Sequence, residues 1–298
     1  MFQSITARIW FLVVAPLIVA MILSGLLISK DWSDYEQTRQ SGRELEMMNI
    51  TRDLIHYLQS ERGMSVVSLG DTSTHTHNLL NEARANADKK YESLKALHEA
   101  PHRDERIRAE QDAFLAQVEA LIAARTRIDD RSTDVAQIKV SYTTTIKQGL
   151  TVESLYLESG LQKDGKLIES LSRLKEMTGQ MRASGAAYLN SAAKGSGYYD
   201  ALSSYNQVKL FEKSAWTQLV DQLKLTGRNT EPVEQIATRQ DFEKMADTLS
   251  SVTALGNKTL PPSSDWFMVA TVWIDDLKAY EHSIVASVLQ DVVHQAHM

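Results

Sequence analysis

The spacing of apolar residues constrains this chain most, because they recur every three or four positions along most of its length. One such stripe runs along the C-terminal stretch: Trp266, Ala270, Trp273, Leu277, Tyr280, Ile284 and Val288. This spacing places the side chains on one face of an α-helix. With 13 glycines and 5 prolines in 298 residues, the chain also has few of the turn signals that a sandwich or a barrel needs. The sequence therefore predicts an all-α fold.

Capping and helix-breaking residues divide this pattern into about eight helices after the N-terminal segment. The first is expected to end at Gly70, the seventh to begin at Thr230 with Pro232 in its first turn, and the last to follow Pro261. The helices between are expected at about 78–99, 103–129, 130–160, 166–189 and 198–225. Short connections between them favour antiparallel bundle packing.

The N-terminal segment contains an uncharged run, from Ile9 to Ser29. At about 1.5 Å per residue, a helix of this length matches the ~30 Å hydrocarbon core of a bilayer. A cleaved signal peptide has a shorter apolar stretch followed by a small-x-small site, and no clear site of that kind follows here. We therefore expect residues 9–29 to be a retained transmembrane signal anchor.

The charges that flank this run predict its orientation. Arg8 precedes it, whereas Lys30, Asp31 and Asp34 follow it. Under the positive-inside rule the N-terminus then lies in the cytoplasm. The expected organisation is a cytoplasmic start and anchor over residues 1–30 and an extracytoplasmic helical domain over residues 31–298.

Composition and motifs exclude several classes of function. The net charge is -6 and no basic stripe is interleaved with aromatic residues, so nucleic acid is not an expected partner. The chain has no cysteine, no glycine-rich phosphate loop and no spacing typical of a catalytic triad, so we predict neither an enzyme nor a cofactor. The pairs His75/His77 and His294/His297 have no evident third ligand, so no metal site is predicted.

Three arginines stand at positions where the helical pattern calls for apolar residues. Arg62 lies four residues from both Leu58 and Val66, and Arg182 and Arg239 are placed similarly in the fifth and seventh predicted helices. Burying an unpaired charge costs several kcal/mol, so each of these arginines needs a partner. A planar guanidinium offers a fork of N–H donors that matches a planar oxyanion. We therefore predict Arg62, Arg182 and Arg239 as binding residues for a small anion.

A simpler interpretation of the same arginines remains open. An arginine on an apolar stripe often extends to solvent or pairs with a carboxylate of a neighbouring helix. Glutamates that could act as such partners are Glu61, Glu153, Glu158 and Glu176. Periodicity alone does not distinguish these two interpretations.

Arg62 and Arg182 also belong to a faint internal repeat, about 120 residues apart. Superposing them pairs Gly63 with Ala183 and places Gly70, a helix-ending residue, on Asn190. Small residues beside each arginine would let neighbouring helices approach or leave room for a ligand. The repeat predicts a pseudo-symmetric pair of helices.

Two segments that carry these arginines resemble the nitrate- and nitrite-sensing domain family. The segment LIHYLQSERGMSVVSLG, Leu54–Gly70, resembles the family's opening signature, with its core at Leu58, Gln59, Glu61, Arg62, Gly63 and Ser65. The segment LKEMTGQMRASGAAYL, Leu174–Leu189, is similar to the second arginine helix, although Met181 stands where a glutamate is common. With the last helix included, the resemblance covers about residues 33–290.

The resemblance implies two packed four-helix bundles that hold nitrate or nitrite with arginines between helices. Arg62 matches the family best and Arg182 next, whereas Arg239 matches only by helix position. Family members include bacterial chemoreceptors and sensor kinases, so the resemblance implies signal transduction at the inner membrane, with a periplasmic sensor domain that forms a homodimer by analogy. Such receptors continue into a signalling module, and we expect that output to lie outside this chain. The alternatives are a helical bundle that docks a protein partner and a sensor for a small carboxylate.

Overall fold

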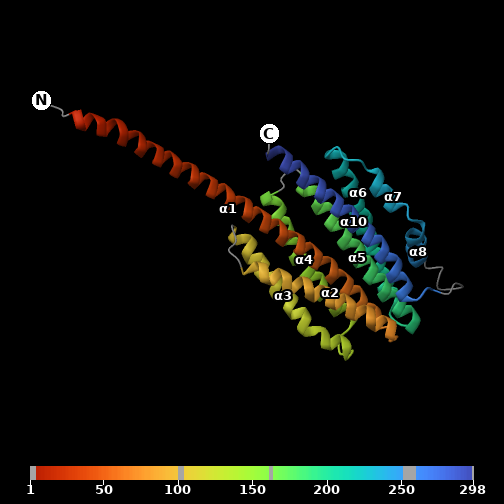
Figure 1. Ribbon diagram of the computed structural model, residues 1–298. Helices are drawn as coiled ribbons and strands as arrows, with labels where there is room; N and C mark the ends of the chain where they lie inside the picture. Colours follow the sequence, from red (N-terminus) through yellow and green to blue (C-terminus); the bar gives the residue numbers. More distant parts are fainter. Residues whose placement is uncertain (1–4, 100–103, 161–163, 251–259, 297–298) are drawn as a thin grey trace. The chain divides into compact units, whose positions relative to one another are not determined.

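The computed structural model describes residues 5–99, 104–160, 164–250 and 260–296. Within these ranges every regular element is a helix, so the all-α prediction is confirmed (Figure 1). The longer helices are α1 (Ile5–Ser68), α2 (Thr74–His98), α3 (Glu105–Asp129), α4 (Val135–Gly160), α5 (Gly165–Lys194), α6 (Tyr198–Leu225) and α10 (Ser263–Ala296). Two shorter helices precede α10, namely α7 (Glu231–Ala237) and α8 (Gln240–Ser250).

Capping residues explain where several helices begin and end. The Ser73 side chain accepts a hydrogen bond from the Thr76 backbone N–H and thereby starts α2. His75 and His77 consequently lie in the first turn of this helix. The left-handed Gly195, with φ 69°, ends α5.

The chain divides into two compact units, residues 1–46 and residues 47–298, and each is described by itself. In the first unit α1 carries exposed apolar side chains, among them Leu17, Val19 and Leu23. No helix in the described part of the chain is long and apolar enough to cross a membrane. Much of the predicted anchor, residues 9–29, lies outside the residues whose side chains are described, so the anchor stays a prediction.

In the second unit, the part of α1 from Met47 onward packs with α2, α3 and α4 (Figure 1). Glu61 on α1 illustrates this packing, because it accepts hydrogen bonds from Arg125 on α3 and from Tyr142 on α4. Helix α5 packs extensively against α6 and α10, and α7 and α8 lie against α10. Contacts between α4 and α5 join these two groups.

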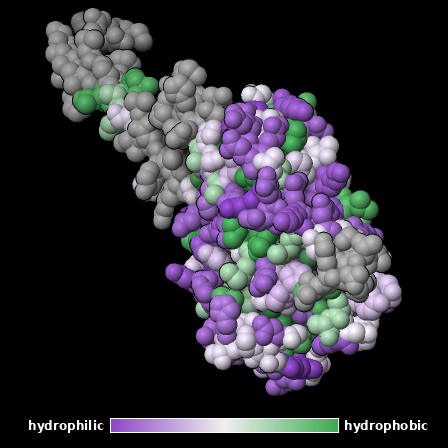
Figure 2. Space-filling view, turned by 90° about the vertical axis from the view of Figure 1, so that its right-hand side faces the viewer, coloured by the Kyte–Doolittle hydropathy of each residue, from purple (hydrophilic) through white to green (hydrophobic). Residues whose placement is uncertain are grey.

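The outer surface of this unit is mixed in polarity. Figure 2 shows a face on which hydrophobic residues are interspersed among hydrophilic ones. Large apolar side chains exposed on the described surface include Val140 on α4, Leu210 and Leu225 on α6, and Met268 on α10. These side chains come from several helices, as is ordinary for a folded domain.

Helices α1 and α5, which carry the internal repeat, lie side by side and run in the same direction. An added Cβ on Gly63 would lie 3.3 Å from Arg182, and one on Gly70 would lie 2.2 Å from Asn190. The predicted end of the fifth helix near Asn190 is wrong, because α5 continues to Lys194. The Asn190 amide instead caps α1, donating to the Val66 carbonyl at 2.9 Å. The two related segments therefore form one pair of helices at the centre of the unit.

The aromatic core fixes α10 against α5. Trp266 is fully buried, and its indole N–H donates to the Arg182 carbonyl at 2.8 Å. The indole lies against Gly185, where an added Cβ would be only 2.3 Å from the ring nitrogen. Phe242 of α8 stacks between Trp266 and Trp273, with ring centroids 5.7 and 4.6 Å apart. Small residues beside Arg182 therefore admit a large aromatic ring from α10.

Candidate functional site

Arg62 lies on α1 between α4 and α5 and is 0% exposed. Its guanidinium holds the Glu176 carboxylate with both terminal nitrogens, Nη1 to Oε1 at 2.7 Å and Nη2 to Oε2 at 3.2 Å. Nη1 also donates to the Thr143 hydroxyl at 2.9 Å. This fork geometry is the arrangement in which a guanidinium recognises a planar anion.

The Glu176 carboxylate is surrounded by donors. Besides Arg62, the Gln59 side-chain amide donates to Oε2 at 2.9 Å and the Gln180 amide donates to Oε1 at 2.8 Å. Two guanidinium N–H groups and two amides thus hold one planar anion. We call these donors, from Gln59, Arg62 and Gln180, the Arg62 nest.

Arg182 lies on α5 and is 1% exposed, but its surroundings differ. It donates to the Thr271 hydroxyl at 2.7 Å and to the Gln59 carbonyl at 2.9 Å. Its guanidinium lies 4.5 Å from the centroid of the Phe267 ring. No carboxylate of the described residues forms an ion pair with it. Arg182 is therefore a buried cation held by neutral groups alone.

The surroundings of Arg182 shift its pKa. Burial, and next the charge of Arg62, lower the pKa of Arg182 to about 9, while Asp275 and Glu176 partly oppose the shift. The guanidinium still carries its charge at neutral pH. The Nε atoms of both Arg62 and Arg182 are buried without a hydrogen-bond partner among the described residues. Both arginines therefore retain an N–H donor that an additional acceptor would satisfy.

Glycines let the two arginines approach each other's helix. An added Cβ on Gly179 of α5 would lie 3.0 Å from Nη2 of Arg62, and one on Gly63 of α1 would lie 3.3 Å from Nε of Arg182. Each guanidinium thus lies against a glycine of the opposite helix. The sequence prediction that small residues beside the arginines allow close approach is confirmed by this reciprocal arrangement.

Comparison with known protein families decides the family of this chain. The family model described as nitrate and nitrite sensing matches residues 53–289. The chain belongs to the nitrate- and nitrite-sensing family. The resemblance noted in the sequence is confirmed, and the match includes Arg62 and Arg182.

Comparison with solved structures shows the fold. The structure of the NasR transcription antiterminator is similar, with a TM-score of 0.70, over 90% of this chain and 74% of that chain. The two sequences are 16% identical, so this likeness concerns the fold alone. Among the curated proteins compared, none matches this chain.

The third arginine predicted from the sequence lies elsewhere in this nitrate- and nitrite-sensing domain. The predicted seventh helix is interrupted, because α7 ends at Ala237 and α8 begins at Gln240. Arg239 lies in this break, where its carbonyl accepts hydrogen bonds from the first turn of α8. Its side chain is 42% exposed and pairs with Asp276 of α10. The prediction that Arg239 occupies the apolar stripe of a helix is wrong, and the structure does not bring it together with Arg62 and Arg182.

The possible glutamate partners divide among different cations. Glu176 pairs with Arg62, as the simpler interpretation allowed for one arginine. Glu61 instead pairs with Arg125 of α3, and Glu153 pairs with Arg52. That interpretation therefore accounts for Arg62 but not for Arg182.

Lys139 of α4 is a cation near the site that the sequence prediction missed. It is half-buried and donates to the hydroxyls of Ser184 at 2.8 Å and Ser204 at 3.2 Å. Burial, and next the charge of Arg62, lower its pKa. It lies one helical turn before Thr143, which accepts a hydrogen bond from Arg62. Its sequence position gave no signal, since it does not interrupt an apolar stripe.

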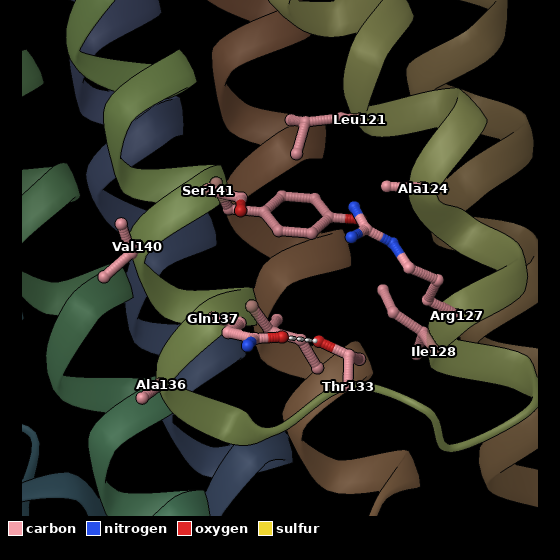
Figure 3. A pocket seen from close by; sticks show the side chains of 11 residues that line it. Leu121, Ala124, Arg127, Ile128, Thr133, Ala136, Gln137, Val140 and Ser141 are labelled. Carbon is pink, nitrogen blue, oxygen red and sulfur yellow. Dashed lines mark hydrogen bonds between the residues drawn. The ribbon is translucent and has the colours of Figure 1, made fainter.

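A cavity of about 390 Å³ lies between α3 and α4 (Figure 3). Its walls include Leu121 and Arg127 of α3, and a 2.9 Å hydrogen bond joins Thr133 and Gln137 at its edge. Neither Arg62 nor Arg182 lines this cavity. Among the residues whose side chains are described, no group of three or more His, Asp or Glu could hold a metal ion. The His294/His297 pair lies outside those residues.

Proposed function

We propose that this chain senses nitrate or nitrite by binding the anion between α1 and α5, at Arg62 and Arg182. The observation that carries the proposal is Arg182, a charged guanidinium buried without a carboxylate partner. Arg62 forms an ion pair with Glu176, whereas Arg182 forms none among the described residues. A monovalent planar oxyanion gives Arg182 an anionic partner and offers acceptors to the free Nε donors.

Burial of the site provides a route from binding to signal. Both arginines are almost completely shielded from solvent, at 0% and 1% exposure. An anion therefore reaches them only when neighbouring helices move apart, and it then draws the two guanidiniums together. Binding energy is in this way coupled to the relative positions of α1, α4 and α5.

The proposal includes the membrane arrangement expected from the sequence. Residues 9–29 anchor the chain in the bacterial inner membrane with the N-terminus in the cytoplasm, and the domain after residue 30 is periplasmic. Chains form a homodimer, and motion of α1 carries the signal across the membrane to an output partner outside this chain. Carbonate extraction of bacterial membranes tests the anchor: the full chain stays in the pellet, whereas a chain without residues 1–30 is released.

Calorimetry and thermal unfolding against nitrate, nitrite, chloride, sulfate and acetate test ligand binding. At a hundredfold excess over Kd, the specific anion stabilises the fold by about 2.7 kcal/mol. Nitrate or nitrite should produce this shift while chloride and sulfate do not. A shift with acetate alone would favour the carboxylate sensor, and no shift with any anion would favour the protein-docking bundle.

A further inference from the structure

The Arg62 nest is already filled in this structure by a side chain of the protein itself. The Glu176 carboxylate receives the Arg62 fork and the amides of Gln59 and Gln180. A carboxylate, nitrate and nitrite all present two oxygens on one planar centre, so one set of donors suits all three. We propose that Glu176 is an internal substitute ligand that must leave the nest before the external anion binds there. This inference rests on the function proposed above and adds that Glu176 sets the affinity of the site for the anion.

The structure provides a place for the displaced carboxylate. A cavity of about 510 Å³ lies between α4 and α5, and its walls include Glu176, Gln180, Lys147 and Arg173. Lys147 and Arg173 are exposed cations on α4 and α5. Arg173 stands three residues before Glu176 on α5, a spacing at which helical side chains of opposite charge pair. Rotation of the Glu176 side chain toward this cavity exchanges a buried ion pair for a solvated one.

Displacement also changes what connects α1 to α5. In the present state, Gln59 and Arg62 of α1 are tied to α5 through a carboxylate fixed to the α5 backbone. When a free anion replaces the Glu176 carboxylate, α1 no longer contacts α5 through a side chain of α5. It contacts α5 through the bound anion, which also contacts Arg182. The exchange therefore reports anion occupancy at the junction of α1, α4 and α5.

Competition by Glu176 has a measurable consequence for affinity. Every binding event must overcome the charge-assisted hydrogen bonds that hold the Glu176 carboxylate. The empty site is consequently stable, and only an anion that matches the nest competes well. Removing the charge of Glu176 while keeping its shape should tighten binding, even though Glu176 lines the site.

Glu176→Gln in the full chain, purified in detergent, tests this inference by nitrate titration calorimetry. The expected Kd is at least about tenfold lower than that of the wild type, since a tenfold change corresponds to about 1.4 kcal/mol. The matched control is Glu281→Gln, which removes the charge of another buried glutamate, one that pairs with Lys175 and does not line the cavity between α4 and α5. Its nitrate Kd should stay within about threefold of the wild type. A wild-type or weaker affinity in Glu176→Gln, when the wild type binds nitrate, overturns the inference.

Glu176→Ala with formate as the probe provides a readout that does not depend on nitrate sensing. Truncation leaves the nest without its anion, and formate has the same planar pair of oxygens. Formate should raise the unfolding temperature of this variant in a saturable way, but not that of the wild type or of Glu281→Ala. An equal formate effect in all three proteins overturns the inference. A wild type that ignores nitrate, alongside a Glu176→Ala variant that binds formate, overturns the proposed function and leaves Glu176 as the occupant of the nest.

Discussion

Two groups of buried charges lie along α1 and α5, and they are built differently. The first, the Arg52 cluster, comprises Arg52, Glu153, Lys175 and Glu281. Arg52 pairs with Glu153 at 2.8 Å and Lys175 pairs with Glu281, so two cations meet two anions. The second, the Arg62 cluster, comprises Arg62, Glu176 and Arg182. Here the described residues form one ion pair, between Arg62 and Glu176, and Arg182 forms none.

This difference distinguishes the Arg52 cluster, whose charges stabilise the fold, from the Arg62 cluster, which is the candidate ligand site. The Ser172 hydroxyl lies 2.9 Å from Glu153 and 3.0 Å from Glu281 and shares its one proton between them, so each anion of the Arg52 cluster has both a cation and a hydroxyl within reach. Unpartnered donors occur in both clusters, at Nη2 of Arg52 and at Nε of Arg62 and Arg182, but only Arg182 has neutral acceptors alone. Both clusters are equally buried, so burial alone does not identify a binding site. The candidate binding site is identified by Arg182, a buried cation that forms no ion pair among the described residues.

Breaking the balanced cluster should give the largest loss of stability. In Glu281→Gln, the Lys175 ammonium loses its carboxylate in a fully buried position. We expect the free energy of unfolding in denaturant to fall by about 3–5 kcal/mol, because an uncompensated buried charge remains. Nitrate affinity of the folded fraction should be unchanged. The exposed substitution Glu243→Gln is the control, and a loss below about 1 kcal/mol in Glu281→Gln would contradict the structural role of the Arg52 cluster.

Closing the space beside Arg182 should have a smaller effect. In Gly63→Ala the new methyl group would lie 2.6 Å from the Phe267 ring and 3.3 Å from Arg182. Overpacking of this kind costs about 1–3 kcal/mol, and the displaced ring lies over the guanidinium. Thermal unfolding and nitrate titration should show lower stability together with weaker binding. Gly42→Ala, whose Cβ meets nothing within 4 Å, is the control. Unchanged nitrate binding in Gly63→Ala would show that the packing of Gly63 against Phe267 and Arg182 does not contribute to nitrate binding.

Most of the helical architecture could be predicted from the sequence, because caps and periodicity are local. The start of α2 was missed by four residues, since Ser73 rather than a later residue provides the cap. The break between α7 and α8 was also missed, because Ile236, Arg239 and Phe242 keep helical spacing across it. The acidic Asp241 and Glu243, which lie in the first turn of α8, were the available signal for a new N-terminus.

The charge imbalance of the site could not be predicted in the same way. Arg62 and Arg182 are recognisable because each interrupts an apolar stripe. Their partners depend on which helices meet, and several glutamates were available. Glu61 adjoins Arg62 in sequence but points to α3 and α4, since successive helical residues face different directions. Only the packed structure shows that Glu176 serves Arg62 while Arg182 is left unpaired.

Replacing each buried arginine by methionine should distinguish the clusters directly. Arg182→Met removes an uncompensated charge, so the ligand-free protein should gain about 1 kcal/mol of stability and lose its response to nitrate. Arg52→Met leaves Glu153 without its cation and should lose several kcal/mol instead. Chemical unfolding with and without nitrate measures both effects. Equal destabilisation by the two substitutions would show that Arg182 is as well compensated as Arg52.

Lys139 should contribute the smallest effect, because it is half-buried and lies beside the Arg62 cluster rather than within it. Lys139→Gln is expected to weaken nitrate binding by about two- to fivefold, or about 0.4–1 kcal/mol. Burial, and next the charge of Arg62, lower the pKa of Lys139. As pH rises through this depressed pKa the ammonium loses its charge, and its share of the affinity disappears at a lower pH than for an ordinary lysine. Titrations across alkaline pH should therefore show a larger decline in the wild type than in Lys139→Gln, where only Arg182, with a pKa of about 9, loses its charge. A decline of equal size in both proteins would assign the pH dependence to Arg182 alone and contradict a contribution from Lys139.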